Sequence, residues 1–306
     1  MVALSLLMFI AILSGCGDAS KATEADGKIK VVTSFYPLYY FSKEIGGEDA
    51  SVTNLIPAGV EPHDWTPKSK DLTTLAKARL FVYNGAGLEG WVGDMLHGVE
   101  SGSDVINVEA SKGIDLIRGN PEEDEDGHDH GGLDVDPHTW VSPRSAIMMA
   151  TNIKDAFVKV DPDHAAGYES RFNDLTERLR KLDEKFIAGL SGLARKDIVV
   201  SHQAFGYLCR DYGLNQIAVM GLSPEAEPRA KDLLAIAKFV KENRIPYIFF
   251  EELVSERLAN TLASEAGVKT LVLNPLEGLT PEQEKAGDDY FTISERNLEN
   301  LRKALG

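Results

Sequence analysis

The histidines of this chain are its first candidates for metal binding, because neutral imidazoles bind borderline divalent ions such as Zn²⁺. Seven histidines occur in the 306 residues, and three of them fall in the acidic stretch DEDGHDHGGLDVDPHTW at 124–140. His128 and His130 stand among glycine and aspartate, whereas His138 directly follows Pro137. Glycine is conformationally permissive and proline fixes its own backbone. We therefore expect the first two imidazoles to be loosely held and His138 to be fixed in place.

Four candidate ligands are expected to meet at one cleft. Ligands of open α/β sheets bind in the crevice outside the carboxyl ends of the strands. Each candidate follows a predicted strand or a short apolar segment: His63 after Val52–Ile56, His138 after Leu133–Val135, His202 after Asp197–Ser201 and Glu277 after Thr270–Leu273. Three imidazoles with one carboxylate suit a tetrahedral ion such as Zn²⁺, whereas Mn²⁺ favours more carboxylate oxygen. The spacing is long-range, so spacing alone leaves open that each histidine packs in the core.

The elements that would position these residues alternate between apolar runs and helical patterns, as in parallel α/β proteins. The predicted strands of a first lobe are Ile29–Ser34, Val52–Ile56, Leu80–Tyr83 and Val105–Val108, and those of a second lobe are Asp197–Ser201, Gln216–Val219, Tyr247–Phe250 and Thr270–Leu273. Helical patterns lie at Leu72–Ala78, Gly90–Leu96, 228–242, 255–266 and 288–304, and Ser142-Pro143 marks a further helix start. The predicted fold class is α/β, with two Rossmann-like lobes, each a mostly parallel sheet flanked by helices.

One long helix is predicted between the lobes. Its apolar residues recur every three or four positions, at Tyr168, Phe172, Leu175, Leu179, Leu182, Phe186 and Leu190. Some 28 residues at about 1.5 Å each make a rod of about 40 Å. Such a rod resists wide hinge closure, because bending it would strip backbone hydrogen bonds. The predicted domains are an N-terminal lobe at 29–160, a rigid linker helix at 161–192 and a C-terminal lobe at 193–306.

The amino-terminal run VALSLLMFIAILSGC is apolar but too short to span a bilayer, which indicates a secretory signal. Its end, Leu-Ser-Gly-Cys16, resembles the lipobox of bacterial lipoproteins. By that resemblance, residues 1–16 are a signal peptide ending at Cys16, Cys16 carries the lipid, and 17–28 form a tether. An uncleaved apolar anchor is the alternative, because no lysine or arginine precedes the run. The other cysteine, Cys209, has apolar neighbours and is expected to be a buried small hydrophobe.

The charge balance argues against nucleic-acid binding. Forty-eight acidic residues against 32 basic ones give a net charge of −16, which repels nucleic acid and anionic lipid and attracts cations. The stretch EEDEDGHDHGG at 122–132 concentrates that acidity. Such a loop cannot bury itself and is expected to stay solvated.

Four segments of the chain resemble, in the same order, segments of the metal-binding lipoprotein subunits of bacterial zinc and manganese ABC importers. They are EPHDWTPKSKDL, DPHTWVSPRSA, SHQAFGYLCRDYGL and IFFEELVSERLANTLASEAGVKTLVLNPLEGLT. The resemblance covers nearly the whole chain. It implies two α/β lobes joined by one long helix, with a metal bound between them. It also implies a non-enzymatic, monomeric, extracytoplasmic protein, lipid-anchored at the outer face of the membrane, that delivers Zn(II) to an ABC permease.

Carried over position by position, the resemblance implies that His63, His138 and His202 are metal ligands. A glutamate takes the third place in manganese-type relatives, so His202 implies the zinc branch. The segment Leu-Asn-Pro-Leu-Glu, which ends at Glu277, resembles the corresponding segment of the Gram-positive zinc binders. In those proteins the glutamate of this segment is a metal ligand. In other relatives water fills that place.

Zinc-type relatives often carry a mobile loop rich in histidine and acid, and 122–132 resembles a short version of it. This suggests that His128 and His130 sample zinc weakly and raise its local concentration. The alternative is a solvated acidic loop without a metal role.

Other functions fit parts of the same pattern. A manganese-binding homologue or an adhesin of the same fold is compatible with the resemblance. Three histidines around zinc with an open fourth position also describe zinc-dependent hydrolases. A carboxylate in that position closes the shell and favours storage and delivery.

The remaining candidates have structural interpretations beside functional ones. His97 and His164 are expected near helix ends, away from the metal. Trp65 and Trp140 each follow a candidate ligand by two residues, so they either wall the site or pack in the core. Glu251 and Glu252 end a predicted strand beside the cleft. They are expected either to hydrogen-bond a ligand imidazole or to pair with Arg229 or Arg257.

Overall fold

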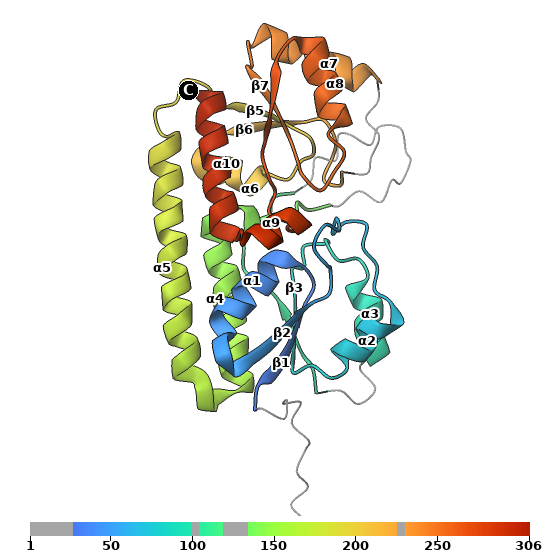
Figure 1. Ribbon diagram of the computed structural model, residues 1–306, viewed down its shortest axis with the longest axis vertical. Helices are drawn as coiled ribbons and strands as arrows, with labels where there is room; N and C mark the ends of the chain where they lie inside the picture. The colour runs from blue at the N-terminus through green and yellow to red at the C-terminus, as the bar shows by residue number, and fades with distance from the viewer. Residues whose placement is uncertain (1–26, 100–103, 119–133, 225–229) are drawn as a thin grey trace, which may run out of the picture.

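Two four-stranded parallel sheets lie one above the other along the long axis of the molecule (Figure 1). The computed structural model describes residues 27–99, 104–118, 134–224 and 230–306. The first sheet has the order β2-β1-β3-β4 and the second the equivalent order β6-β5-β7-β8. The strands are β1 Ile29–Thr33, β2 Ala50–Asn54, β3 Leu80–Tyr83, β4 Ile106–Glu109, β5 Asp197–Val200, β6 Asn215–Ala218, β7 Tyr247–Phe250 and β8 Lys269–Val272.

The predicted fold class is confirmed, and each of the eight predicted strands corresponds to an observed one. The largest shift is at β2, which begins two residues before the predicted Val52 and ends at Asn54. The backbone ladder continues past that end, because Leu55 N–H donates to Thr33 O and Ile56 N–H to Ser34 O. The apolar run that predicted the strand therefore continues into the loop that carries His63.

Helices cover both faces of each sheet. They are α1 Tyr36–Gly46, α2 Ser69–Leu75, α3 Val92–Val99, α4 Pro143–Val160, α5 Ala165–Leu190, α6 Gly206–Tyr212, α7 Ala230–Glu242, α8 Arg257–Ala266, α9 Pro281–Ala286 and α10 Tyr290–Leu305. In the first lobe, α1 and α4 lie on one face of the sheet, and α2 and α3 lie on the other (Figure 1). No helix was predicted over α1, whose largest residues are aromatic and whose buried face includes Leu38, Phe41 and Ile45.

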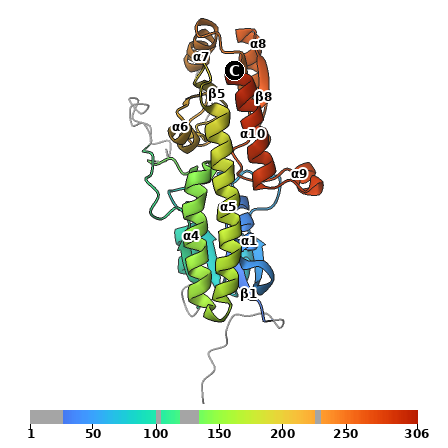
Figure 2. The same cartoon turned by 90° about the vertical axis from the view of Figure 1, so that its left-hand side faces the viewer.

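The long helix α5 runs along one side of both lobes, between α4 and α10 (Figure 2). Six of its seven predicted stripe residues are buried, and Phe172 is half-buried. Arg171 ties the helix to the first lobe by donating to Ile45 O at 2.7 Å and to Asp49 at 2.7 Å. At its other end, Lys185 pairs with Glu295 of α10 at 2.6 Å. The helix thus braces both lobes, while the predicted domain limits stay a prediction.

Contacts between the lobes add to this brace. Tyr290 at the start of α10 packs edge-on against Phe41 of α1, with ring centroids 5.0 Å apart. Its hydroxyl donates to Trp140 O at 2.6 Å. The two lobes therefore share one continuous apolar core on the α5 side. In the part of the chain that the structure describes, no helix has both the length and the apolar run that a membrane crossing requires.

We expect Leu179→Ala, in the middle of α5, to lower the free energy of unfolding by about 2–5 kcal/mol. Leu179 is fully buried in the shared core, so its truncation leaves a cavity where both lobes meet the helix. Leu234→Ala is the matched control, because that leucine is 72% exposed. Urea unfolding of the metal-free protein measures both. Equal losses for the two variants would contradict the bracing role.

Candidate metal centre

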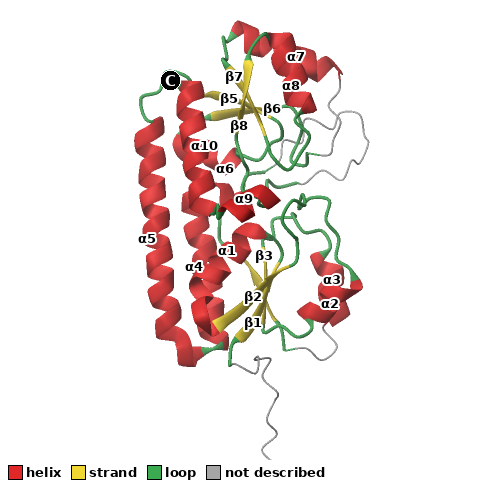
Figure 3. Ribbon diagram, viewed as in Figure 1, coloured by secondary structure: helices red, strands yellow, loops and turns green. Residues whose placement is uncertain are grey.

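Loops of both lobes face each other between the two sheets (Figure 3). The four predicted ligands form one cluster. His63 lies in the loop after β2, His138 directly before the short 3-10 turn Thr139–Val141, and His202 two residues after β5. Glu277 lies in the loop after β8. One ligand atom from each side chain lies within 4.8 Å of the other three. The four side chains singled out in the sequence therefore lie in one cluster.

The distances inside the cluster are those of a small tetrahedral shell. His138 Nε2 lies 3.2 Å from His63 Nε2 and 3.2 Å from His202 Nε2. Glu277 Oε1 lies 3.3 Å from His138 Nε2, 3.5 Å from His202 Nε2 and 3.7 Å from His63 Nε2. Zinc–ligand bonds of about 2.0–2.1 Å in a tetrahedron place neighbouring ligand atoms about 3.3–3.4 Å apart. The five measured separations fit that geometry without rearrangement.

Carboxylates behind the cluster orient two of the imidazoles. Asp136 Oδ1 lies 2.8 Å from His138 Nδ1 and also accepts the His138 backbone N–H at 2.9 Å. Glu251 Oε1 lies 2.8 Å from His202 Nδ1 and accepts the His202 N–H at 3.2 Å. A carboxylate at Nδ1 favours the tautomer with the proton on that nitrogen, which leaves the Nε2 lone pair free for a metal. The hydrogen bond predicted for Glu251 is therefore observed.

The charge state of the cluster is set by burial and by these carboxylates. Burial alone would lower the pKa of His202, but Glu251 and Glu277 outweigh it and hold that pKa well above its ordinary value. Burial is likewise outweighed at His138, whose pKa is raised by Asp136 and Glu277. At His63 burial prevails and the pKa is lowered.

Glu277 remains a carboxylate in this environment. Burial raises its pKa, but the three imidazoles outweigh that effect and hold the pKa well below its ordinary value. Its side chain is almost fully buried, and within the described residues Oε1 accepts no hydrogen bond. A buried anionic oxygen of this kind requires a positive partner. A divalent cation among the four donor atoms satisfies it.

Sequence reasoning did not identify Asp136 or its neighbour Gly206 as part of the site. Gly206 begins α6 in the second lobe, and a Cβ atom at that position would overlap Asp136 Oδ2 of the first lobe. The carboxylate that orients His138 therefore fits only because residue 206 has no side chain. The signal in the sequence was the acidic residue directly before each Pro-His pair, Glu61 and Asp136.

Glu61, like Asp136, stands directly before a Pro-His pair, but its contacts differ from those of Asp136. It accepts the Asp64 backbone N–H at 3.2 Å. Burial, together with the negative charge of Glu277, raises the pKa of Glu61 to about 8.

Among the described residues, Glu252 contacts neither a ligand imidazole nor Arg257, and Arg229 lies outside them. Glu252 Oε2 accepts hydrogen bonds from the side-chain amides of Asn274 and Gln283, each at 2.7 Å.

The two tryptophans differ from each other. Trp140 is fully buried, its ring centroid lies 5.3 Å from that of His138, and its indole N–H donates to Pro275 O at 2.7 Å. It thus belongs to both the wall of the cluster and the core. Trp65 is half-buried and packs on Trp91 at 5.0 Å, so it lies with the α2 and α3 side of the first lobe.

The other predicted residues lie away from the cluster or outside the described chain. His97 is in the last turn of α3. His164 directly precedes α5, with its Nδ1 2.8 Å from Asp161 Oδ2. Cys209 is buried, and burial with the nearby Asp136 raises the pKa of its thiol to about 12. Cys16, His128 and His130 lie outside the described residues, so their predicted roles stay predictions.

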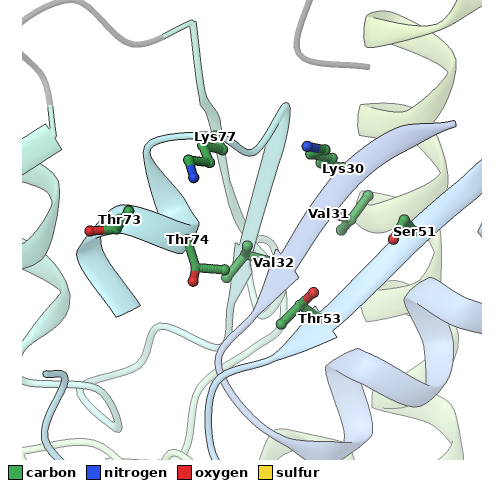
Figure 4. Close-up of a pocket in the computed structure, with 8 residues that line it drawn as sticks. All are labelled: Lys30, Val31, Val32, Ser51, Thr53, Thr73, Thr74 and Lys77. Carbon is green, nitrogen blue, oxygen red and sulfur yellow. The ribbon is translucent and has the colours of Figure 1, made fainter. Parts of the chain in front are cut away.

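A hollow in the first lobe, away from the cluster, lacks the side chains that bind a divalent cation. It encloses about 200 Å³ beside α2 and the strands β1 and β2 (Figure 4). Its lining offers ammonium groups, hydroxyls and valine, with no carboxylate, imidazole or thiol: Lys30, Val31, Val32, Ser51, Thr53, Thr73, Thr74 and Lys77. The cluster between the lobes is therefore the candidate metal centre.

Comparison with known proteins agrees with this fold. The model of the family described as zinc-uptake complex component A, periplasmic, matches residues 31–304. The chain therefore belongs to this family. It is 43% identical over 288 residues to the zinc-binding lipoprotein AdcA of Streptococcus pneumoniae, covering 93% of this chain and 57% of AdcA. The chain thus spans little more than half of the AdcA proteins that it matches.

Two further known proteins are matched over almost their whole length. The chain is 42% identical over 300 residues to the high-affinity zinc uptake system protein ZnuA of Bacillus subtilis, covering 96% of this chain and 94% of that protein. The crystal structure of the Zn(II)-bound ZnuA-like domain of S. pneumoniae AdcA superposes with a TM-score of 0.78 at 41% identity, covering 91% of this chain and 99% of that domain.

We expect Gly206→Ala to weaken binding of a divalent cation at the four-residue cluster by about 10–100-fold, the loss typical when a group that orients a ligand is displaced. The added methyl group would push Asp136 away from His138 Nδ1. Gly90→Ala is the control, because a Cβ there meets no atom within 4 Å. A competitive titration against a chelator measures both. An unchanged affinity in Gly206→Ala would contradict the orienting role of Asp136.

Proposed function

We propose that this protein captures Zn(II) outside the cytoplasmic membrane, holds it between its lobes and delivers it to the permease of an ABC importer. The proposed ligands are the Nε2 atoms of His63, His138 and His202 and the carboxylate of Glu277. The observation that carries the proposal is the set of separations of 3.2–3.7 Å among these buried donor atoms. The zinc-binding and zinc-uptake names of its relatives support the same ion.

The donor set supports zinc over manganese. Three imidazole nitrogens and one carboxylate oxygen suit a borderline d¹⁰ ion that accepts four ligands, whereas Mn²⁺ favours oxygen-rich, octahedral shells. The cluster is also enclosed, since His138 and His202 are fully buried and the side chain of His63 is 5% exposed. Little room remains for the water ligands that an octahedral ion would keep.

The same enclosure supports transport rather than hydrolysis. Catalytic zinc sites keep an open position for water or substrate beside three protein ligands. Here Glu277 takes the fourth position and is 2% exposed. A shell of four protein donors holds the ion and suppresses its Lewis-acid chemistry.

The proposed location follows from the amino terminus and from the relatives. The lipobox-like ending at Cys16 supports a lipid anchor, and one relative is named a lipoprotein. The family description places its members in the periplasm. A protein held at the outer face of the membrane by the tether 17–28 would stay within reach of a permease.

Release is proposed to proceed through local loop movement. The helix α5 and the shared core on its side hold the two lobes together. The ligands themselves lie in loops, which rearrange at lower cost than a helix of 26 residues bends. The lobes should therefore move little between the metal-free and metal-loaded states.

We expect His138→Ala and His202→Ala each to lower the zinc affinity by orders of magnitude, because each removes a buried, oriented donor. His164→Ala is the control, since that imidazole is 47% exposed and pairs with Asp161. Competitive titrations with zinc and manganese, with elemental analysis of protein purified without added metal, measure affinity and selectivity. Retention of binding in a His63/His138/His202 triple alanine variant, or a preference for manganese, would refute the proposal.

We also expect zinc binding to release protons at neutral pH. The carboxylates of Glu251 and Glu277 raise the pKa of His202 above its ordinary value, which favours the protonated imidazole in the metal-free protein, and zinc must displace that proton. The apparent affinity should rise with pH up to the raised pKa and level off above it. Calorimetric titrations in two buffers of different ionisation enthalpy measure the release. Identical heats in both buffers would contradict this charge state.

A further inference from the structure

Two adjacent glutamates at the end of β7 face different ligand-bearing loops. Glu251 turns toward His202 and accepts its ring and backbone N–H groups. Glu252 turns toward the loop after β8, which carries Glu277. Glu251 is buried, whereas Glu252 is an exposed residue whose hydrogen bonds to Asn274 and Gln283 are partly buried. Burial of the side chain therefore does not explain why Glu252 contacts the loop that carries Glu277.

The loop after β8 depends on one asparagine side chain. Asn274 Oδ1 accepts the Leu276 backbone N–H at 2.7 Å, which forms an Asx-type turn two residues long. This contact fixes the orientation of the amide, because its oxygen must face the Leu276 N–H. Its nitrogen then faces Glu252 Oε2, to which it donates at 2.7 Å. The backbone of Asn274 is held separately by Asn297, through two hydrogen bonds at 2.9 and 2.6 Å.

The turn holds a strained residue directly before the ligand. Leu276 has a φ of 64°, in the left-handed region that a branched side chain rarely adopts. Its side chain is 1% exposed, so the core fixes it as well. Such a conformation persists only where the surroundings over-determine it. The turn at Leu276 sets the direction in which Glu277 leaves the loop.

We propose that Glu252 is a positioning residue for Glu277. Its carboxylate holds the Asn274 amide in the rotamer that keeps Leu276 left-handed, and that backbone directs the Glu277 carboxylate into the cluster. The same oxygen accepts the Gln283 amide at 2.7 Å, which ties the start of α9 to the loop. The inference rests on the proposed function, in which Glu277 is a zinc ligand.

The alternative explanation is that Glu252 acts on zinc binding through its negative charge alone. A carboxylate near the cluster would attract a cation whether or not it held Asn274. Glu252→Gln separates the two effects, because its amide oxygen can accept the same hydrogen bonds without the charge. Glu252→Ala removes both. Water can replace the lost acceptor, since the position is exposed, but water fits other rotamers of Asn274 equally well.

The test is a set of zinc titrations on the full chain with five variants, one of them a charge control. We expect Glu252→Ala to bind zinc about 10–100-fold more weakly and Glu252→Gln to stay within about threefold of the parent. Glu277→Ala should weaken binding as well. The double variant Glu252→Ala/Glu277→Ala should bind no more weakly than Glu277→Ala alone, because both changes remove the same ligand. Glu265→Ala, an exposed glutamate of α8, is the charge control.

A spectroscopic readout distinguishes positioning from a loss of stability. The visible absorption of Co(II) bound in place of zinc is strong in a tetrahedral shell and weaker when water raises the coordination number. We expect this absorption to fall in Glu252→Ala and to be retained in Glu252→Gln. Thermal unfolding of the metal-free variants checks that the lobes remain folded.

Three outcomes would overturn this inference alone, provided that Glu277→Ala weakens binding. They are an unchanged affinity in Glu252→Ala, an equal loss in Glu252→Gln and Glu252→Ala, or additive losses in the double variant. If Glu277→Ala left the zinc affinity intact, the ligand assignment of the proposed function would be wrong, and this inference with it.

Discussion

The structure depends on one unfavourable arrangement: three imidazole nitrogens and a carboxylate oxygen lie within 4.8 Å of one another in a buried cluster, and five of their six separations are 3.2–3.7 Å. Lone pairs at such separations repel one another unless a proton or a cation lies between them. The fold therefore has to bear the cost of holding four donors together. It does so with loops, three of which leave the carboxyl ends of parallel strands, and with the carboxylates of Asp136 and Glu251, which orient His138 and His202.

The two lobes meet this cost jointly, because each supplies half of the donors and part of the support for the other half. Trp140 of the first lobe donates to Pro275 in the loop that carries Glu277, and Gly59 N–H donates to Leu279 O of the same loop at 2.8 Å. Gly206 of the second lobe leaves the space that Asp136 occupies. With α5 fixed along both lobes, these contacts favour a preformed site. Specificity then comes from the number and type of donors rather than from closure around the ion.

Much of the frame was predictable from the sequence, because buried parallel strands read as short apolar runs and α5 carries an unbroken apolar stripe. His63, His202 and Glu277 were identifiable because each follows a strand end, and His138 because it follows a short apolar segment. All four also stand in segments that resemble those of metal-binding relatives. The supporting residues were harder to predict. The contact between Gly206 and Asp136 joins positions 70 apart in the chain, and the turn at Leu276 depends on an amide held from β7. Neither leaves a local pattern of periodicity or spacing.

The central claim is that all four side chains coordinate one zinc ion. X-ray absorption at the zinc edge of the loaded protein tests it most directly. The account predicts a four-coordinate shell of three imidazole nitrogens and one carboxylate oxygen, with bonds of about 2.0–2.1 Å. A six-coordinate shell dominated by oxygen, or scattering from fewer than three imidazoles, would contradict it.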